Sequence, residues 1–163
     1  MLNIRPASAA DVPLILELIR ELADYEREPD QAIDTSADLM RDGFDPVTPP
    51  RFRVVIAEWE RQPAGFALFF YSYSTWQGRP GIFLEDLFVR PVFRGKGIGK
   101  ALLAHLAQIA IDENCTRFAW QVLDWNQLAI DFYESLGAKM MKEWLNMRVS
   151  GPALRSLAKL GAK

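Results

Sequence analysis

The sequence predicts an α/β fold with a mixed, mostly antiparallel central sheet and helices on both faces. Three strand-like segments follow one another in the middle of the chain, at 53–59, 64–73 and 82–89. All three are rich in apolar residues, and the second is nearly continuously apolar, as in a strand buried on both faces. Helical apolar stripes precede and follow them, at about 11–25 and 98–114.

The remaining elements are shorter and are bounded by proline, glycine and capping residues. A strand at 2–5 ends at Pro6, and Ser8 to Asp11 has the spacing of a capping box at the start of the first long helix. We also expect a short second helix at 37–42, a further strand at 117–123 and a helix at 126–136 that is closed by Gly137. A final strand pair at 139–142 and 144–150 and a terminal helix at 153–160 complete the chain.

Length and composition fit one globular domain over residues 1–163. The formal net charge of −2 gives no basic excess for binding nucleic acid. A single cysteine, Cys115, excludes an internal disulfide, and with His105 as the only histidine we expect no metal site. The chain shows no signal peptide and no apolar run that spans a bilayer, so we expect a cytoplasmic protein without a membrane partner.

A glycine-rich loop joins the third strand to the long helix, and it reads R-G-K-G-I-G-K from Arg94 to Lys100. The first amides of a helix lack intrahelical acceptors and carry partial positive charge, and glycines let a phosphate approach the backbone closely. With the cations Arg94, Lys96 and Lys100, the loop is typical of a diphosphate cradle. It does not match a P-loop at either end, and it lacks the third glycine of a dinucleotide fingerprint. The alternative is a glycine-rich turn of another α/β protein.

A second motif begins about 30 residues later and reads N-Q-L-A-I-D-F-Y-E-S-L-G-A, from Asn126 to Ala138. The spacing Arg94-x-x-Gly97-x-Gly99 resembles the pyrophosphate loop of the GCN5-related N-acetyltransferases (GNAT). The second motif resembles the segment N-x-x-A-x-x-x-Y-x-x-x-G-[FA] of the same superfamily, which this chain matches at Asn126, Ala129, Tyr133, Gly137 and Ala138.

Four further segments resemble the diamine acetyltransferase branch of that superfamily, and within it most closely the thialysine N-epsilon-acetyltransferases. They lie at 23–26, 73–78, 84–86 and 122–127. The resemblance implies acetyl transfer from acetyl-CoA to a small primary amine, by direct attack in a ternary complex, and a homodimer. Polyamine-selective members often have an acidic residue before the loop tryptophan, where this chain has Ser74-Thr75, which favours a shorter, amino-acid-like amine.

The resemblance also implies a set of residues that hold acetyl-CoA. The strand before the loop splays from its neighbour in this family, so its amides are free for the pantetheine carbonyls, and one N–H near Phe88 stabilises the thioester oxyanion. The implied cofactor-binding residues are Leu87, Phe88, Val89, Arg94, Gly95, Lys96, Gly97, Ile98, Gly99, Lys100, Asn126, Ala129 and Tyr133.

The chemistry requires that an ammonium lose a proton, because only a neutral amine attacks a thioester and alkyl ammonium pKa values lie near about 10.4. The resemblance assigns Tyr133 as the general acid for the leaving thiolate; the alternative is a tyrosine packed in the core. Glu85 either anchors the cation or takes its proton through water. Because strand side chains alternate, we expect Glu85 and Asp86 to face opposite sides, with Asp86 a structural ligand for backbone amides.

Tyr25, Glu26 and Trp76 match family positions near the amine, and each has an ordinary structural alternative at a helix end or in a loop. His105, Cys115 and the helix charges Glu17 and Glu21 are interpreted as structural.

Two other functions remain open: acetylation of a protein lysine or N-terminal amine, which needs a peptide groove, and acyl-CoA binding without turnover. Tyr133 and Glu85 argue against the latter, because binding alone requires neither.

Overall fold

A computed structural model of the chain describes residues 1–161. They form two compact units, of which the first is Met1–Gln121 and the second begins at Val122. The first unit contains a five-stranded sheet in the order β1-β2-β3-β4-β5. The first four strands pair antiparallel, and β5 pairs parallel to β4, which confirms the mixed, mostly antiparallel sheet. Their bounds are Leu2–Pro6, Arg53–Trp59, Gln62–Ser74, Arg79–Val89 and Phe118–Trp120.

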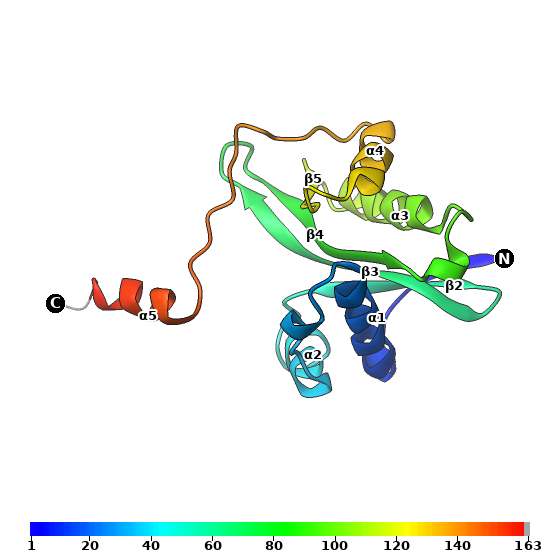
Figure 1. The fold of residues 1–163 in the computed structure, drawn as a ribbon, viewed down its shortest axis with the longest axis horizontal. Coiled ribbons are helices and arrows are strands. Elements are labelled where there is room, and N and C mark those ends of the chain that lie inside the picture. The colour runs from blue at the N-terminus through cyan, green and yellow to red at the C-terminus, as the bar shows by residue number, and fades with distance from the viewer. Residues whose placement is uncertain (162–163) are drawn as a thin grey trace. The chain divides into compact units, whose positions relative to one another are not determined.

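Helices cover both faces of this sheet, as the sequence predicts (Figure 1). One face is covered by α1 (Val12–Tyr25) and α2 (Ser36–Gly43), and the other by α3 (Ile98–Asp112). The core under α1 and α2 includes Ile15, Leu18, Leu22, Leu39, Ile56, Phe66, Leu68 and Phe88. None of the helices in residues 1–161 has the length and apolar character needed to cross a membrane.

The predicted capping box closes a short 3₁₀ turn, Ala9–Asp11, which leads directly into α1 at Val12. The backbone N–H of Ser8 donates to Oδ2 of Asp11 at 2.8 Å, and Arg5 of β1 donates to both carboxylate oxygens of Asp11, at 2.9 and 2.8 Å. These hydrogen bonds hold the pKa of Asp11 far below its ordinary value. The first helix is therefore tied to the edge strand at the point where it begins.

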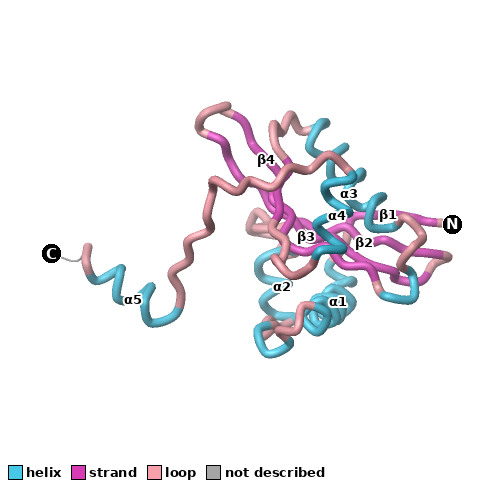
Figure 2. Tube along the Cα trace, turned by 45° about the horizontal axis from the view of Figure 1, so that its top comes forward, coloured by secondary structure: helices cyan, strands magenta, loops and turns pink. Residues whose placement is uncertain are grey.

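The β3–β4 hairpin is longer than its neighbours. β2 pairs with β3 only as far as Phe69, whereas β3 continues beside β4 to Ser74 (Figure 2). The hairpin therefore extends beyond the end of β2, with its turn at residues 75–78. This arrangement places the glycine-rich loop at one end of β4 and the hairpin turn at the other.

The second unit contains α4 (Gln127–Ser135) and α5 (Gly151–Lys159). The Asn126 side chain caps α4 by accepting the Ala129 N–H at 3.3 Å. Gly137 closes the helix as predicted, with φ of 91° and with the Ala138 N–H donating to the Tyr133 carbonyl at 3.1 Å. The fixed asparagine and glycine of the second motif thus mark the two ends of α4.

The predicted strand pair at 139–142 and 144–150 is wrong, because these residues contain no strand (Figure 2). Their apolar residues are compatible with β structure, but a strand exists only where another strand supplies hydrogen bonds. The terminal helix is confirmed, although it begins earlier than predicted, at Gly151. Pro152 lies in its first turn, where a missing N–H costs nothing, so the proline starts the helix instead of breaking the chain.

Gly65 allows β3 and β4 to approach closely. A Cβ at this position would lie 2.3 Å from the Phe88 carbonyl oxygen and 3.1 Å from the Val89 Cα. We predict that Gly65→Ala lowers the free energy of unfolding by about 2–4 kcal/mol, measured by urea denaturation, because backbone must shift to admit the methyl group. The control is Gly161→Ala, whose nearest contact would be an ordinary 3.8 Å, and wild-type stability in Gly65→Ala would contradict the prediction.

Candidate active site

β4 contains one extra residue at the position of the two candidate carboxylates. Leu68 of β3 pairs with Asp86, whereas the next residue, Phe69, pairs with Leu84, so Glu85 has no partner in register. Such a bulge interrupts the alternation of side chains between the faces of a sheet. Leu84 therefore shares the α3 face with Phe69, while Asp86 shares the α1 and α2 face with Leu68.

The alternation that predicts opposite sides for Glu85 and Asp86 does not continue through this bulge. Glu85 is exposed, but Asp86 is largely covered. Burial raises the pKa of Asp86 to about 7, with smaller contributions from the negative charges of Glu85, Glu26 and Asp34. Among residues 1–161 no N–H group donates to the Asp86 carboxylate, so it is not the ligand for backbone amides that the sequence suggested.

These four acidic residues form what we call the carboxylate cluster: Glu26, Asp34, Glu85 and Asp86. Glu26 caps the C-terminal end of α1, and burial raises its pKa. In Asp34, which precedes α2, the Oδ1 atom is buried without a hydrogen-bond partner in the described chain. Desolvated, like-charged carboxylates disfavour additional negative charge and favour a cation. An alkyl ammonium would supply both the positive charge and hydrogen-bond donors.

The cofactor loop has the geometry that the sequence predicts for an anion site. Gly95 and Gly97 both have φ of 77°, a left-handed conformation that favours glycine, and Gly97 is the N-cap of α3. No described protein atom lies within 4 Å of the position that a Cβ would take at either residue. The first amides of α3 and the side chains of Lys96 and Lys100 are therefore suited to a pyrophosphate.

Arg94, the first residue of this loop motif, is held from two elements. Its Nε donates to the Val89 carbonyl oxygen at 3.0 Å, which ties it to the end of β4. Its guanidinium carbon lies 4.6 Å from the centroid of the Tyr25 ring and 5.8 Å from that of Phe88. Tyr25, the last residue of α1, thus contacts the cofactor loop directly.

The edge of β4 facing β5 is unpaired beside this loop. β5 pairs with β4 only at 82–84, which leaves 85–89 without a partner on that side. The Arg90 N–H donates to Ala64 of β3 at 2.9 Å, and strict alternation from that pair turns the N–H groups of Leu87 and Val89 toward the unpaired side. The same alternation turns the Phe88 N–H toward β3.

A salt-bridge network, which the sequence reading did not identify, fixes α1 over β4. Arg90 contacts Glu17 at 2.5 Å and Glu21 at 2.7 Å, and it donates to the Pro63 carbonyl at 3.1 Å. Glu17 and Glu21 were expected to be ordinary charges on the helix surface. Their spacing of four residues on one helix face was the available signal, but the partner is 69 to 73 residues away in the chain.

The other predicted site residues lie at separate places. Trp76 is in the β3–β4 turn and is 89% exposed. Asn126, Ala129 and Tyr133 belong to the second unit, where Asn126 caps α4 and the Tyr133 ring lies 5.4 Å from that of Phe132. The structure therefore brings Tyr25, Glu26 and Glu85 together with the cofactor loop in the first unit.

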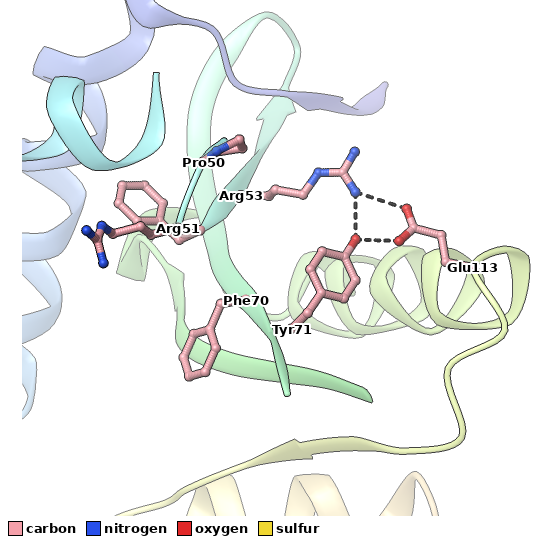
Figure 3. Close-up of a pocket in the computed structure, with 7 residues that line it drawn as sticks. Pro50, Arg51, Arg53, Phe70, Tyr71 and Glu113 are labelled. Atoms are coloured by element: carbon pink, nitrogen blue, oxygen red, sulfur yellow. Dashed lines mark hydrogen bonds and ion pairs between the residues drawn. The ribbon is translucent and has the colours of Figure 1, made fainter. Parts of the chain in front are cut away.

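A pocket of about 310 Å³ lies elsewhere in the first unit, and no predicted site residue lines it (Figure 3). Three of its polar side chains bond to one another: Arg53 donates to Tyr71 at 2.6 Å and to Glu113 at 2.9 Å, and the Tyr71 hydroxyl donates to Glu113 at 2.6 Å. Arg51 pairs with Asp42, outside the pocket. We therefore assign it no part in the chemistry. The lining residues are Pro50, Arg51, Phe52, Arg53, Phe70, Tyr71 and Glu113.

Comparison with known proteins identifies the family. Residues 15–138 match the model of the acetyltransferase (GNAT) family. This chain belongs to that family. A thialysine N-epsilon-acetyltransferase of Sus scrofa is 40% identical over 166 residues, covering 95% of this chain and 96% of that protein. The protein is thus an acyltransferase, in agreement with the motifs around Arg94 and Tyr133.

Two further comparisons extend this result. The L-ornithine N5-acetyltransferase NATA1 of Arabidopsis thaliana is 44% identical over 97 residues, which are 60% of this chain and 42% of that protein. An integron cassette protein from the mobile metagenome of V. cholerae has the same fold, with a TM-score of 0.81 and 30% identity over 97% of this GNAT chain and 98% of the other.

The partly desolvated carboxylate of Asp86 predicts a pH-dependent gain of stability when its charge is removed. Its folded pKa of about 7 lies above the ordinary 3.8, so the stability it contributes is present below about pH 4 and is lost as the pH rises through 7. Relative to wild type, Asp86→Asn should therefore gain about 1–3 kcal/mol of unfolding free energy between pH 5 and pH 8. Denaturant titrations of both proteins at pH 5 and at pH 8 measure this difference in unfolding free energy.

The matched control for this prediction is Glu85→Gln, which also removes one charge from the carboxylate cluster but at an exposed position. Its stability difference from wild type should change by less than about 0.5 kcal/mol over the same interval. An equal pH response in both variants would show that Asp86 is not the desolvated group.

Proposed function

We propose that the protein transfers an acetyl group from acetyl-CoA to a small primary amine of the thialysine or diamine type, by direct attack in a ternary complex. The observation that carries this proposal is the partly buried Asp86 within the carboxylate cluster, to which no described residue donates a hydrogen bond, in the same unit as the anion-binding loop. The names of the relatives support an amine acceptor, since they act on thialysine and L-ornithine.

The carboxylate cluster binds the amine as its ammonium cation. Charge attraction from Glu26, Glu85 and Asp86 is strong in a partly desolvated site, and the cation offsets the desolvation and the smaller charge repulsion that raise the pKa of Asp86. Asp86 then takes a proton from the ammonium, directly or through one water, which leaves the neutral nucleophile. In this assignment Asp86 is the base and Glu85 is the cation anchor.

Acetyl-CoA is held by the cofactor loop and the unpaired edge of β4. The amides of Ile98 and Gly99, with Lys96 and Lys100, bind the pyrophosphate, and the outward N–H groups of Leu87 and Val89 bind the pantetheine and thioester carbonyls. Gly95 supplies the second left-handed residue of the loop. The thioester itself supplies the acetyl group, so the chemistry needs no metal from the protein.

Proton return to the thiolate is assigned to Tyr133, by the family resemblance of the second motif. The phenol gives its proton as the carbon–sulfur bond breaks, so CoA leaves as the thiol. Cys115 is not used as a nucleophile, because burial and the nearby Glu113 raise the pKa of its thiol. Residues 1–163 acting as one N-acetyltransferase domain, in a cytoplasmic homodimer, complete the proposal, as the resemblance implies.

Thiol release from acetyl-CoA across a panel of acceptors tests this function. The panel contains thialysine, lysine, ornithine, putrescine, spermidine and a lysine-containing peptide, and Tyr133→Phe is assayed beside wild type. We expect turnover on the free amino-acid amines and a loss of at least about 10-fold in kcat in the phenol deletion, as for a general acid. Turnover on the peptide alone would replace the small amine with a protein substrate.

The pH profile tests the role of Asp86. Because the base must be ionised, kcat/KM for wild type should rise about 10-fold per pH unit below pH 7 and level off above it. In Asp86→Asn the rise of kcat/KM below pH 7 should disappear, and the rate should fall by at least about 100-fold. Glu85→Gln should raise KM but keep this rise. A rise that persists in Asp86→Asn would assign the base to another group.

A further inference from the structure

One contact connects the amine site with the cofactor loop, and the following inference rests on the proposed function of both. The Arg94 guanidinium stacks over the ring of Tyr25, with 4.6 Å between its central carbon and the ring centroid, within the range of a cation–π contact. Arg94 opens the loop that binds the pyrophosphate. Tyr25 is the last residue of α1 and directly precedes Glu26 of the carboxylate cluster.

The stack joins two segments that are far apart in the sequence. On the loop side, Arg94 is tethered to β4 through the Val89 carbonyl, and two left-handed glycines follow it. On the amine side, α1 ends at Tyr25, Glu26 is its cap, and Arg27 has a φ of 66° that turns the chain away. The contact therefore joins the C-terminal end of α1 to the first residue of the glycine-rich loop.

Each substrate is expected to order one partner of the stack. An ammonium in the carboxylate cluster contacts Glu26 and so fixes the end of α1, including Tyr25. A pyrophosphate in the loop fixes Arg94, whose guanidinium keeps one planar face on the ring while its edge N–H groups serve the phosphate oxygens. Ordering Tyr25 or Arg94 also orders its partner in the stack. The protein therefore loses less conformational entropy when the second substrate binds.

We propose that the Tyr25–Arg94 stack couples the two substrates, so that the amine and the CoA molecule each bind more tightly when the other is present. Because coupling between two binding sites is reciprocal, one factor describes both effects. Tyr25 and Arg94 act here as positioning residues, each conveying to its neighbouring site the occupancy of the other. The coupling favours the ternary complex that direct transfer requires.

Calorimetric titration with CoA measures the factor without turnover. The dissociation constant of CoA is determined with and without a saturating concentration of the best amine from the acceptor panel. For wild type we expect the amine to tighten CoA binding by at least about 5-fold. Tyr25→Phe keeps the aromatic face and should retain this ratio of the two dissociation constants. Tyr25→Leu removes the aromatic face and should bring the ratio below about 2.

Arg94→Lys is the second variant, because it keeps a positive charge for the phosphate but lacks the planar guanidinium. It should also bring the ratio close to one, whatever the variant's affinity for CoA alone. A ratio that stays near the wild-type value in both Tyr25→Leu and Arg94→Lys would overturn the coupling. A wild-type ratio of one would also overturn it.

Turnover separates this inference from the function on which it rests. If the wild-type protein releases thiol with the amine but the variants keep the wild-type ratio, the proposed function stands and the coupling is overturned. If the wild-type protein binds CoA but acetylates no amine in the panel, the proposed function itself is overturned. Circular dichroism melting of each variant excludes loss of fold as the cause of a changed ratio.

Discussion

The extra residue in β4 is the constraint on which the site depends. Leu84 and Leu87 both lie on the α3 face although three positions separate them, and a regular strand with a period of two cannot place them there. The bulge resolves this conflict, and it does so between Glu85 and Asp86. The core packing of β4 therefore brings a carboxylate to the α1 face beside Leu68 and Phe88, where an apolar residue would otherwise be expected. Site and core are specified by the same irregularity.

Placing Asp86 there costs stability. Its carboxylate is desolvated, it lies near three other acids, and no described residue donates to it, so the fold favours the protonated form near neutral pH. The buried and unsatisfied Oδ1 atom of Asp34 shows the same imbalance. A cationic ligand offsets both costs, since it supplies the missing charge and the missing donors. The free protein is in this sense incomplete, and part of the binding energy of an ammonium comes from relieving the repulsion.

Sequence reasoning identified the elements that local rules determine and missed those set by distant partners. The apolar pattern of Arg53–Trp59 and the helix ends at Asn126 and Gly137 depend on nearby residues, and they were predicted correctly. The bulge at Glu85 depends on which β3 residue stands opposite, and the Arg90 network joins residues far apart in the chain. The expected strands at 139–150 failed for the same reason, because a strand requires a partner that the sequence of the segment does not contain. The position of the glycine-rich loop at the start of α3 was predictable because its glycines are close together in the sequence.

Direct transfer between two bound substrates places a demand on the structure that neither site meets alone. Acetyl-CoA bound without an amine presents its thioester to water, and an amine bound without acetyl-CoA has no acceptor for its lone pair. A contact between the two sites makes each a better site when the other is filled. In this chain the aromatic end of α1 and the first cation of the loop already form such a contact, and the Phe88 ring, which is part of the core under α1, supports the guanidinium from β4. The strand that carries Asp86, the proposed base, thus also supports Arg94, through which the proposed coupling acts.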